Sequence, residues 1–427
     1  MNEPPLETPV PPQPAVEPPQ PAAAGVVAAL MAIAVLGVQA YLALARNFAN
    51  LLENPFLPYC LLGAFAIHMA TRPRRREVLW TLGIAVASMA WFLASGGKPT
   101  SARIVASGAF AGLATLAVLA IQVLRLRGAE QLEKLNTLFA GSVFGFSSLF
   151  IAAILNLTTR LHPQTYDLYL YAADQGYRIP IVAWVGQLLE HRPWLFRTCA
   201  YVYESLPLAI SLLYAAQRSG PRRLGMIRVL PAFIGGGVLV YVLYNILPAA
   251  GPYYVFGSAF PNHLPAAPGL HLVTLGEVAR NAIPSMHFGC ALLILWNCRQ
   301  LPRWIYAASA VYLVLTALAA IGLGEHYAVD LVAAVPYVLA LQSVCVPATL
   351  RERPEWKRGL IIGASLTAVW ILTARFGTPL FRSSVFTWGA SIVTLALCGI
   401  ARRRMVRAEF ELTAAAETVP PTSPGTR

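Results

Sequence analysis

Two histidines and an aspartate in the second half of the chain have the types and spacing for nucleophilic or acid–base chemistry. His326 and Asp330 are four residues apart in GEHYAVDL, so on a helix they share one face and lie about one turn apart. A carboxylate in that position can accept the Nδ1 proton of the imidazole, which leaves Nε2 as a directed nucleophile or base. Taken alone, a buried polar pair that only satisfies its own hydrogen bonds is an equally good interpretation.

The second histidine, His287, lies in the segment RNAIPSMHFG. Pro284 favours the first turn of a helix, where free N–H groups and the helix dipole favour an anion. His287 in that turn could protonate a leaving oxygen. Arg280 is the only Lys or Arg in the stretch 248–282 and is a candidate phosphate clamp. The alternatives are a hydrogen-bonded interfacial histidine and an arginine that binds lipid headgroups.

The elements that must position these residues are membrane-spanning helices. Of the 427 residues, 57% are hydrophobic and 12% are charged. A soluble domain carries about 25% charged residues, so a water-soluble enzyme is excluded. The formal net charge of +13 comes from Lys and Arg in short clusters between uncharged runs, which indicates membrane topology and not nucleic-acid binding. The expected fold class is therefore all-α, in a polytopic integral membrane protein.

Apolar stretches of roughly 15–24 residues predict about twelve transmembrane helices. Most Lys and Arg fall on one side if both termini are cytoplasmic, as the excess of positive charge in cytoplasmic loops requires. The two histidines and the aspartate then lie at the starts of two spans that enter from the outer side. We therefore expect an active site on the outer, periplasmic or extracytoplasmic side of an inner or plasma membrane. The predicted spans are 23–45, 55–71, 78–96, 104–124, 136–157, 198–217, 229–247, 283–298, 304–323, 326–347, 359–374 and 384–400.

The spans divide the chain into segments with different expected roles. Two long connections, 158–197 and 248–282, lie on the outer side and are predicted to form an interfacial helix and a Gly/Pro-rich loop over the site. The predicted segments are a disordered Pro-rich cytoplasmic tail (1–22), a four-span region (23–130), a six-span catalytic core (131–347), two C-terminal spans (348–405) and a cytoplasmic tail (406–427).

The motifs together resemble those of a known superfamily. Pro-Ser-x-His at one helix start, followed about forty residues later by His-Tyr-x-x-Asp, resembles the second and third signature motifs of the type 2 phosphatidic acid phosphatase superfamily. Met286 and Tyr327 make the motifs similar to those of the branch that contains inositol phosphorylceramide synthases and sphingomyelin synthase-like enzymes. The resemblance covers roughly residues 136–347 and implies a six-helix catalytic bundle.

The resemblance implies a role for each residue of the triad. His326 would be the nucleophile that forms a phosphohistidine, Asp330 its orienting partner and His287 the acid that protonates the departing alcohol. The implied enzyme is a membrane phosphotransferase that moves the headgroup of a phosphatidylinositol-like donor to a lipid alcohol or glycan. No metal or cofactor is implied, because cationic and backbone donors can stabilise the transferred charge.

The chain departs from the phosphatase pattern in two places. The loop NILPAAGPYYVFG lacks the Lys-x6-Arg-Pro pattern, and Ala320 stands where the third motif of the phosphatases has its arginine. Fewer cations suit a phosphodiester, which carries less charge than a phosphomonoester. Glu204 could bind a sugar or inositol hydroxyl or pair with Arg280, and a structural hydrogen bond is at least as plausible. The expected substrate-binding residues are Arg280, Ser285, Tyr253, Gly251, Asn245 and Glu204.

Three alternatives stay open. A lipid or polyprenyl-phosphate phosphatase of the same superfamily would use water as the acceptor. A secondary transporter has a similar number of spans, but its substrate site would lie near the bilayer midplane and not at the outer rim. The third is a catalytically inactive scaffold. The expected partners are membrane lipids, with no nucleic acid and an oligomeric state left open, and His68 and the six cysteines are expected to be structural.

Overall fold

The computed structural model describes residues 22–44, 54–94, 103–219, 227–266 and 269–418. Each predicted apolar stretch forms one helix or a bent pair of helices, because long runs of Ala, Leu, Ile and Val bury their backbone polar groups most easily in helical hydrogen bonds. The predicted all-α class is confirmed for these residues, which contain two short strands. The predicted tail at 1–22 lies outside the described residues except for Ala22.

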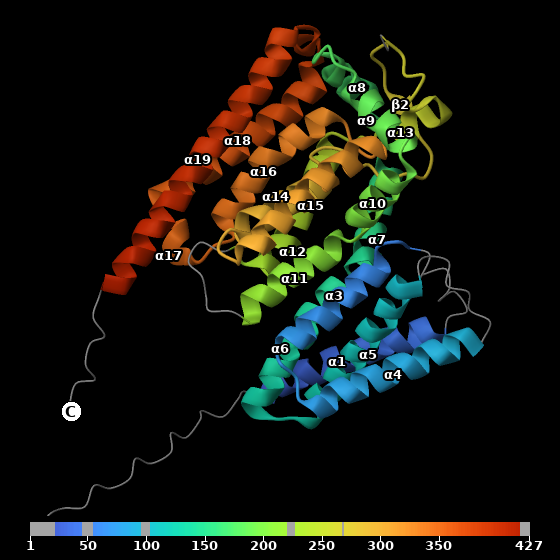
Figure 1. Cartoon of the computed structure of the whole chain (residues 1–427), viewed down its shortest axis with the longest axis vertical. Helices are drawn as coiled ribbons and strands as arrows, with labels where there is room; N and C mark the ends of the chain where they lie inside the picture. The colour runs from blue at the N-terminus through green and yellow to red at the C-terminus, as the bar shows by residue number, and fades with distance from the viewer. Residues whose placement is uncertain (1–21, 45–53, 95–102, 220–226, 267–268, 419–427) are drawn as a thin grey trace, which may run out of the picture.

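The N-terminal helices form a group that packs around α5 (Figure 1). Leu57, Leu61, Leu116 and Leu138 are among the fully buried side chains of its core. Helix α3 also packs against α11, so this group touches the rest of the bundle. The helices of the group are α1 (Ala22–Leu44), α3 (Leu57–Ala70), α4 (Arg75–Ala94), α5 (Arg103–Arg125) and α6 (Gly128–Gly145).

The central bundle contains two helix pairs that bend sharply. The axis turns by 47° between α6 and α7 and by 51° between α10 and α11. The helices are α7 (Ser147–Leu161), α10 (Pro193–Glu204), α11 (Leu206–Ser219), α12 (Val229–Ile246), α14 (Met286–Cys298), α15 (Arg303–Gly322) and α16 (Ala328–Val344).

The C-terminal helices cover one side of α16. A Cβ on Gly363 would lie 2.6 Å from the backbone nitrogen of Ala340, so only glycine lets α18 approach α16 this closely. The last helix continues to Thr418, so residues 406–418 extend a helix beyond the expected boundary at 405. These elements are α17 (Ala348–Arg351), α18 (Pro354–Phe376), the 3-10 helix η2 (Thr378–Arg382) and α19 (Ser384–Thr418).

The two long connections meet at one end of the molecule, where β1 pairs antiparallel with β2. Gln164 lies opposite Thr274, and Thr165 lies opposite Val273. The first connection forms two short helices instead of one interfacial helix. The elements at this end are β1 (Gln164–Thr165), α8 (Asp167–Gln175), α9 (Ile181–Glu190), α13 (Pro252–Phe256), the 3-10 helix η1 (Gly257–Ala259) and β2 (Val273–Thr274).

The count of twelve membrane spans is not confirmed. By length and composition, six described helices can cross a membrane, or eight if each bent pair is one span. Helix α14 has 13 residues and is about 20 Å long, which is short of the roughly 30 Å hydrocarbon core. It is short because the preceding residues, Ala282 to Ser285, are already buried in non-helical backbone. Several long apolar helices nevertheless indicate an integral membrane protein.

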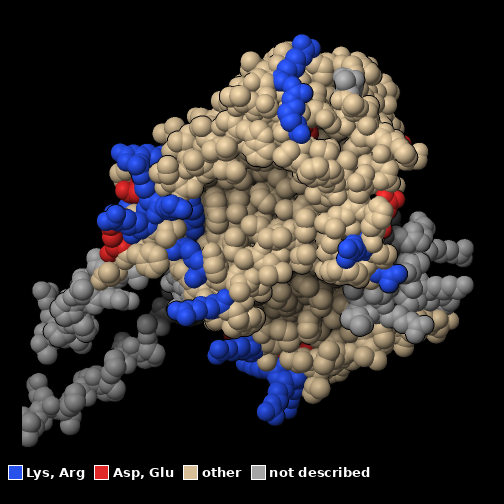
Figure 2. Space-filling view, turned by 45° about the horizontal axis from the view of Figure 1, so that its top comes forward, with Lys and Arg blue, Asp and Glu red and all other residues tan. Residues whose placement is uncertain are grey.

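The surface agrees with a membrane setting. Figure 2 shows a face that is mostly uncharged, with Lys and Arg gathered in groups near its edges. Large apolar side chains such as Trp80, Trp91 and Val385 are more than two thirds exposed on the outside of the helices. Such a surface is stable against lipid chains and not against water.

Candidate active site

His287 and His326 come together because the helices that follow them start at the same end of the molecule. His287 is in the first turn of α14, and His326 lies two residues before α16. The two helices pack against each other, and the ring centroids of the histidines are 6.3 Å apart. His326 is 1% exposed, whereas His287 is only half-buried.

The orientation of His326 is fixed by a backbone carbonyl. Its Nδ1 lies 2.7 Å from the carbonyl oxygen of Ala282 and 3.7 Å from Oδ2 of Asp330. A carbonyl can only accept, so Nδ1 carries the proton and Nε2 keeps a lone pair. We expected Asp330 to be the acceptor, but its Oδ2 accepts the backbone N–H of Tyr327 at 2.8 Å and caps α16. Its Oδ1 is buried and has no hydrogen-bond partner among the residues that the structure describes.

Aromatic side chains form a wall beside the two histidines. The hydroxyl of Tyr203 is 3.4 Å from Nε2 of His326, and its ring stacks on His287 with centroids 3.6 Å apart and planes 13° apart. Phe56 contacts His287 from the start of α3, with ring centroids 5.8 Å apart. Neither residue was predicted, because one is about 80 and the other about 230 residues from His287 and no local motif marks them. The N-terminal region, expected to lie outside the catalytic core, therefore contributes to the site.

Ser285 joins the two helix starts. Helix α14 begins at Met286, so Pro284 precedes the N-cap and does not lie in the first turn as predicted. The Ser285 hydroxyl accepts the N–H of Phe288 at 3.4 Å, and the Ser285 N–H donates to the backbone carbonyl of Asp330 at 3.2 Å. Ser285 is fully buried and its side chain caps α14, while its expected role in substrate binding stays a prediction.

Two aspartates of α8, both missed by the sequence analysis, hold the backbone around the site. Asp174 accepts the N–H groups of Ala328 and Val329 at 2.8 and 2.9 Å, in the first turn of α16. Asp167 accepts the N–H groups of Ala250 and Gly251 at 3.0 and 2.8 Å. The two carboxylates are seven residues apart and thus share a helix face, and this spacing was the available signal.

The glycine at 251 has a conformation that other residues rarely adopt. Its φ is +118°, and a Cβ there would lie 2.5 Å from the backbone oxygen of Glu325. The next turn continues this contact, since the Tyr253 N–H donates to the Gly324 carbonyl at 2.9 Å. Gly251 therefore lets the loop pack directly on the segment that leads into His326.

Glu325 brings a second carboxylate next to the reactive histidine. The hydroxyl of Tyr254 donates to Glu325 Oε1 at 2.9 Å. Burial raises the pKa of Glu325, and the adjacent His326 and the bond from Tyr254 oppose this shift. The charged side chains next to His326 are therefore carboxylates, those of Asp330 and Glu325.

Arg280 is fully buried but its guanidinium is already satisfied by protein carbonyls. Nε donates to the carbonyl of His162, and Nη2 donates to those of Leu275 and Gly276. Nη1 donates to Val278, and no described contact joins the side chain to His287 or His326. Arg280 thus supports the two outer connections, and its expected role as a phosphate clamp stays a prediction.

The three other predicted binding residues are not brought to the histidines by any described contact. Asn245 bonds Nε2 of His162 at 2.9 Å. Tyr253 is 53% exposed on the outside of its loop. Glu204 ends α10 at the bend, where its charge acts on Tyr59, and forms no ion pair with Arg280 within the described part of the chain.

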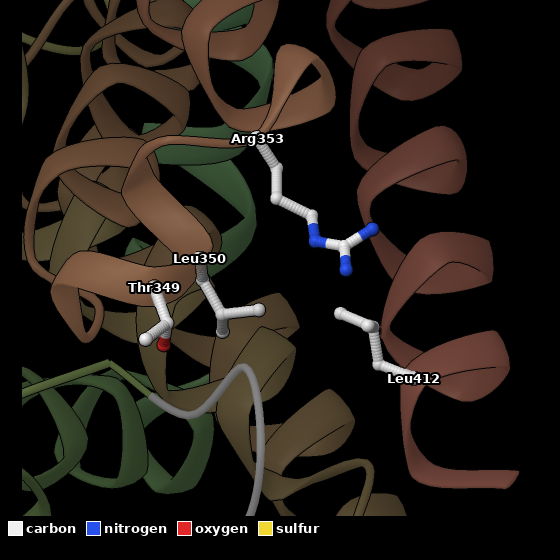
Figure 3. A pocket seen from close by; sticks show the side chains of 4 residues that line it. All are labelled: Thr349, Leu350, Arg353 and Leu412. Carbon is white, nitrogen blue, oxygen red and sulfur yellow. The ribbon is translucent and has the colours of Figure 1, made fainter. Parts of the chain in front are cut away.

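A separate pocket lies at the other end of α16. It is lined by Thr349, Leu350, Arg353 and Leu412, between α17 and α19 (Figure 3). The 17 residues of α16 put about 25 Å between this pocket and His326. It is therefore not part of the histidine site. No group of three or more metal-ligating side chains occurs among the residues that the structure describes.

Comparison with known families places the site within a matched region. Residues 168–344 match the family model described as the PAP2 superfamily, which is less than half of the chain. This region includes both histidines, Asp330, Tyr203 and Asp174. No curated protein and no solved structure matches the chain. The match indicates phosphatase or phosphotransferase chemistry on lipids.

Proposed function

We propose that this protein is a membrane phosphotransferase that acts on a phospholipid headgroup through a phosphohistidine on His326. The observation that carries the proposal is the geometry of the histidine pair. Nδ1 of His326 donates to a carbonyl, so Nε2 has a lone pair available for attack, and His287 lies one phosphate's width away at 6.3 Å. The PAP2 superfamily match over the same residues supports it.

In the first step, Nε2 of His326 attacks the phosphorus of a donor phosphodiester. The bond from phosphorus to the diacylglycerol oxygen breaks, and protonated His287 gives its proton to that oxygen. In the second step, an acceptor hydroxyl attacks the same phosphorus, its proton returns to His287, and the bond to Nε2 breaks. In this proposal, N–H groups in the first turn of α14 and the positive end of the helix dipole stabilise the phosphoryl oxygens.

A phosphodiester donor fits the site better than a phosphomonoester. Arg280 is committed to backbone carbonyls, and the charged side chains beside His326 are the carboxylates of Asp330 and Glu325. A phosphomonoester near neutral pH carries up to two negative charges and would need cations that the described part of the site does not provide. This favours transfer of a headgroup, such as that of phosphatidylinositol, over hydrolysis of phosphatidate.

The test is an assay of purified protein in vesicles that contain phosphatidylinositol and a lipid alcohol. We expect diacylglycerol release that depends on the acceptor, and a loss of about 100-fold or more in H326A and H287A. Glu190→Gln, which changes an exposed carboxylate bonded to Asn262, is the matched control and should retain activity. Full activity in H326A would refute the mechanism, and acceptor-independent phosphate release from phosphatidate would select the phosphatase alternative.

A further inference from the structure

The start of α16 helps to hold His326, which lies two residues before the helix and whose own N–H donates to the carbonyl of Ala320 at 2.9 Å. The first N–H groups of any helix have no partners within the helix. Here Tyr327 donates to Oδ2 of Asp330, while the next two N–H groups, of Ala328 and Val329, donate to Asp174. Three successive N–H groups are thus fixed by two carboxylates.

Asp174 comes from an element that the histidine motifs do not include. It lies on α8, more than 150 residues before α16, and is 5% exposed. No Lys or Arg forms an ion pair with it in the described ranges, so its charge is balanced by the two N–H groups and the positive end of the α16 dipole. Both oxygens are used, one for each N–H group, at 2.8 and 2.9 Å.

Asp167 lies seven residues before Asp174 on the same face of α8, and it connects α8 to the loop at 250–251. It also accepts the hydroxyl of Tyr327 at 3.1 Å, so the residue between His326 and α16 is bonded to α8 as well. Helix α8 therefore bonds to the loop and to the His326 segment at the same time. A shift of α8 would move both.

We propose that Asp174 is a positioning residue for the reaction, which sets the position of His326 by binding both N–H groups at the start of α16 in its ionised form. A protonated carboxyl group has one oxygen that accepts well and one O–H that donates, so it cannot bind both N–H groups. Protonation would leave one buried N–H without an acceptor and loosen the first turn of α16. The catalytic consequence rests on the proposed function, whereas the effect on the backbone does not.

The surroundings of Asp174 place its change from the ionised to the protonated form near neutral pH. Burial raises the pKa of Asp174 to about 7, its two N–H bonds lower it, and the charge of Asp330 raises it further. The other ionisable groups that interact electrically with Asp174 are Tyr171 and Tyr177 on its own segment and Tyr327 beside α16. The remaining packed elements, α13, α18 and η2, add no such group among the described residues.

The experiment is hydrogen exchange of the Ala328 and Val329 amides in the full-length protein, measured from pH 5.5 to 8.5 and corrected for intrinsic rates. We expect their protection, measured relative to that of amides in the middle of α16, to rise through about pH 7 in the wild type, because only ionised Asp174 binds both N–H groups, even though global unfolding becomes easier over the same range. In Asp174→Asn, whose amide offers one acceptor for two donors, protection should fall by about 10- to 100-fold and no longer depend on pH in this range. Glu190→Gln should behave as the wild type does.

Turnover is measured on the same samples. We expect D174N to lower kcat by about 10-fold or more with little change in KM, because the nucleophile is displaced while the headgroup contacts remain. Wild-type protection that does not change with pH, or unchanged protection in D174N, would overturn the proposal. If exchange behaves as expected but no lipid is turned over, the role of Asp174 in fixing α16 stands and the proposed function fails.

Discussion

At the scale of single residues, the reactive atom is defined by what His326 bonds on its other side. Ala282 is an ordinary apolar residue in sequence, yet its carbonyl accepts the Nδ1 proton at 2.7 Å. No motif could have identified it, because the bond depends on how the segment before α14 enters the bundle. The convergence of the two histidines, in contrast, could be predicted, since each precedes or begins a helix that starts from the same side.

Tyr203 combines two contacts that substitutions can separate. Its ring stacks on His287, and its hydroxyl lies 3.4 Å from Nε2 of His326. We expect Y203F to keep the stacking and lose about 10-fold or less in kcat/KM, whereas Y203A should lose about 10-fold more, because His287 is no longer held against a ring. Steady-state kinetics in vesicles measure both. Equal losses in the two variants would show that stacking contributes nothing.

Arg280 is the residue for which the sequence and the structure suggest different roles. A lone arginine before a helix start suggests a phosphate clamp, but its donors are used by carbonyls of His162, Leu275 and Gly276. We expect R280K to lower the free energy of unfolding by about 2–4 kcal/mol, since lysine cannot reach these carbonyls together. Thermal unfolding in detergent measures the loss. If R280K keeps wild-type stability but raises KM strongly, Arg280 binds the phosphate after all.

At the scale of elements, the approximate positions of the helices were predictable from hydropathy, whereas their bends were not. The predicted stretch 198–217 lies within α10 and α11, which meet at an angle of 51°. The bend brings Tyr203 at the end of α10 to the histidines. Pro207 in the first turn of α11 has no N–H to continue the hydrogen bonds of α10, and α10 packs on α15 while α11 packs on α3 and α14. A hydropathy pattern marks an apolar run but carries no information on these neighbours.

The loop before α13 depends on one glycine. Gly251 has φ of +118°, and a Cβ would lie 2.5 Å from the Glu325 oxygen. We expect G251A to destabilise the fold by about 1–3 kcal/mol and to lower activity, because the added Cβ would push the loop away from the segment that precedes His326. Gly276, whose added Cβ would meet nothing within 4 Å, is the matched control. Similar unfolding temperatures for G251A and G276A would contradict this packing argument.

Asp174 on α8 should also make the free energy of unfolding depend on pH. The pKa of Asp174 is raised to about 7 from 3.8, so between these values the folded protein holds a proton that the unfolded chain has released. Raising the pH through this window therefore lowers the free energy of unfolding, by up to about 4 kcal/mol, with no further change above about pH 7. Thermal unfolding of the wild type and D174N at pH 5.5 and 8.5 measures it. We expect the wild type to lose more stability than D174N, and an equal loss would contradict the assignment.

At the scale of the whole molecule, the site lies at one end and the pocket beside Arg353 at the other, about 25 Å away along α16. If the site faces outward, as the distribution of Lys and Arg predicts, Arg192 near α9 should lie on the outer side of the membrane and Arg351 on its cytoplasmic side. Both are exposed. We expect a membrane-impermeant maleimide to label R192C in intact cells and R351C only after permeabilisation, relative to the parent protein. The reverse pattern would place the site on the cytoplasmic side.

The N-terminal spans, which lie outside the predicted catalytic core, contribute a residue to the wall of the site. Helix α3 belongs to the N-terminal region, and its N-cap residue Phe56 lies against His287. The superfamily match begins at residue 168, so a wall of the site comes from outside the matched region. The sequence could locate these spans by hydropathy, but their contact with the site depends on the packing of α3 on α11.

The most direct test of the central claim is to trap the covalent intermediate. Purified protein in vesicles with phosphatidylinositol and no acceptor is denatured at alkaline pH, which preserves phosphorus–nitrogen bonds, and its peptides are mapped by mass spectrometry. We predict a phosphoinositol adduct on His326 that is absent from H326A and disappears when a lipid alcohol is added. Continued headgroup transfer with no adduct on His326, or with the adduct on another residue, would contradict the account.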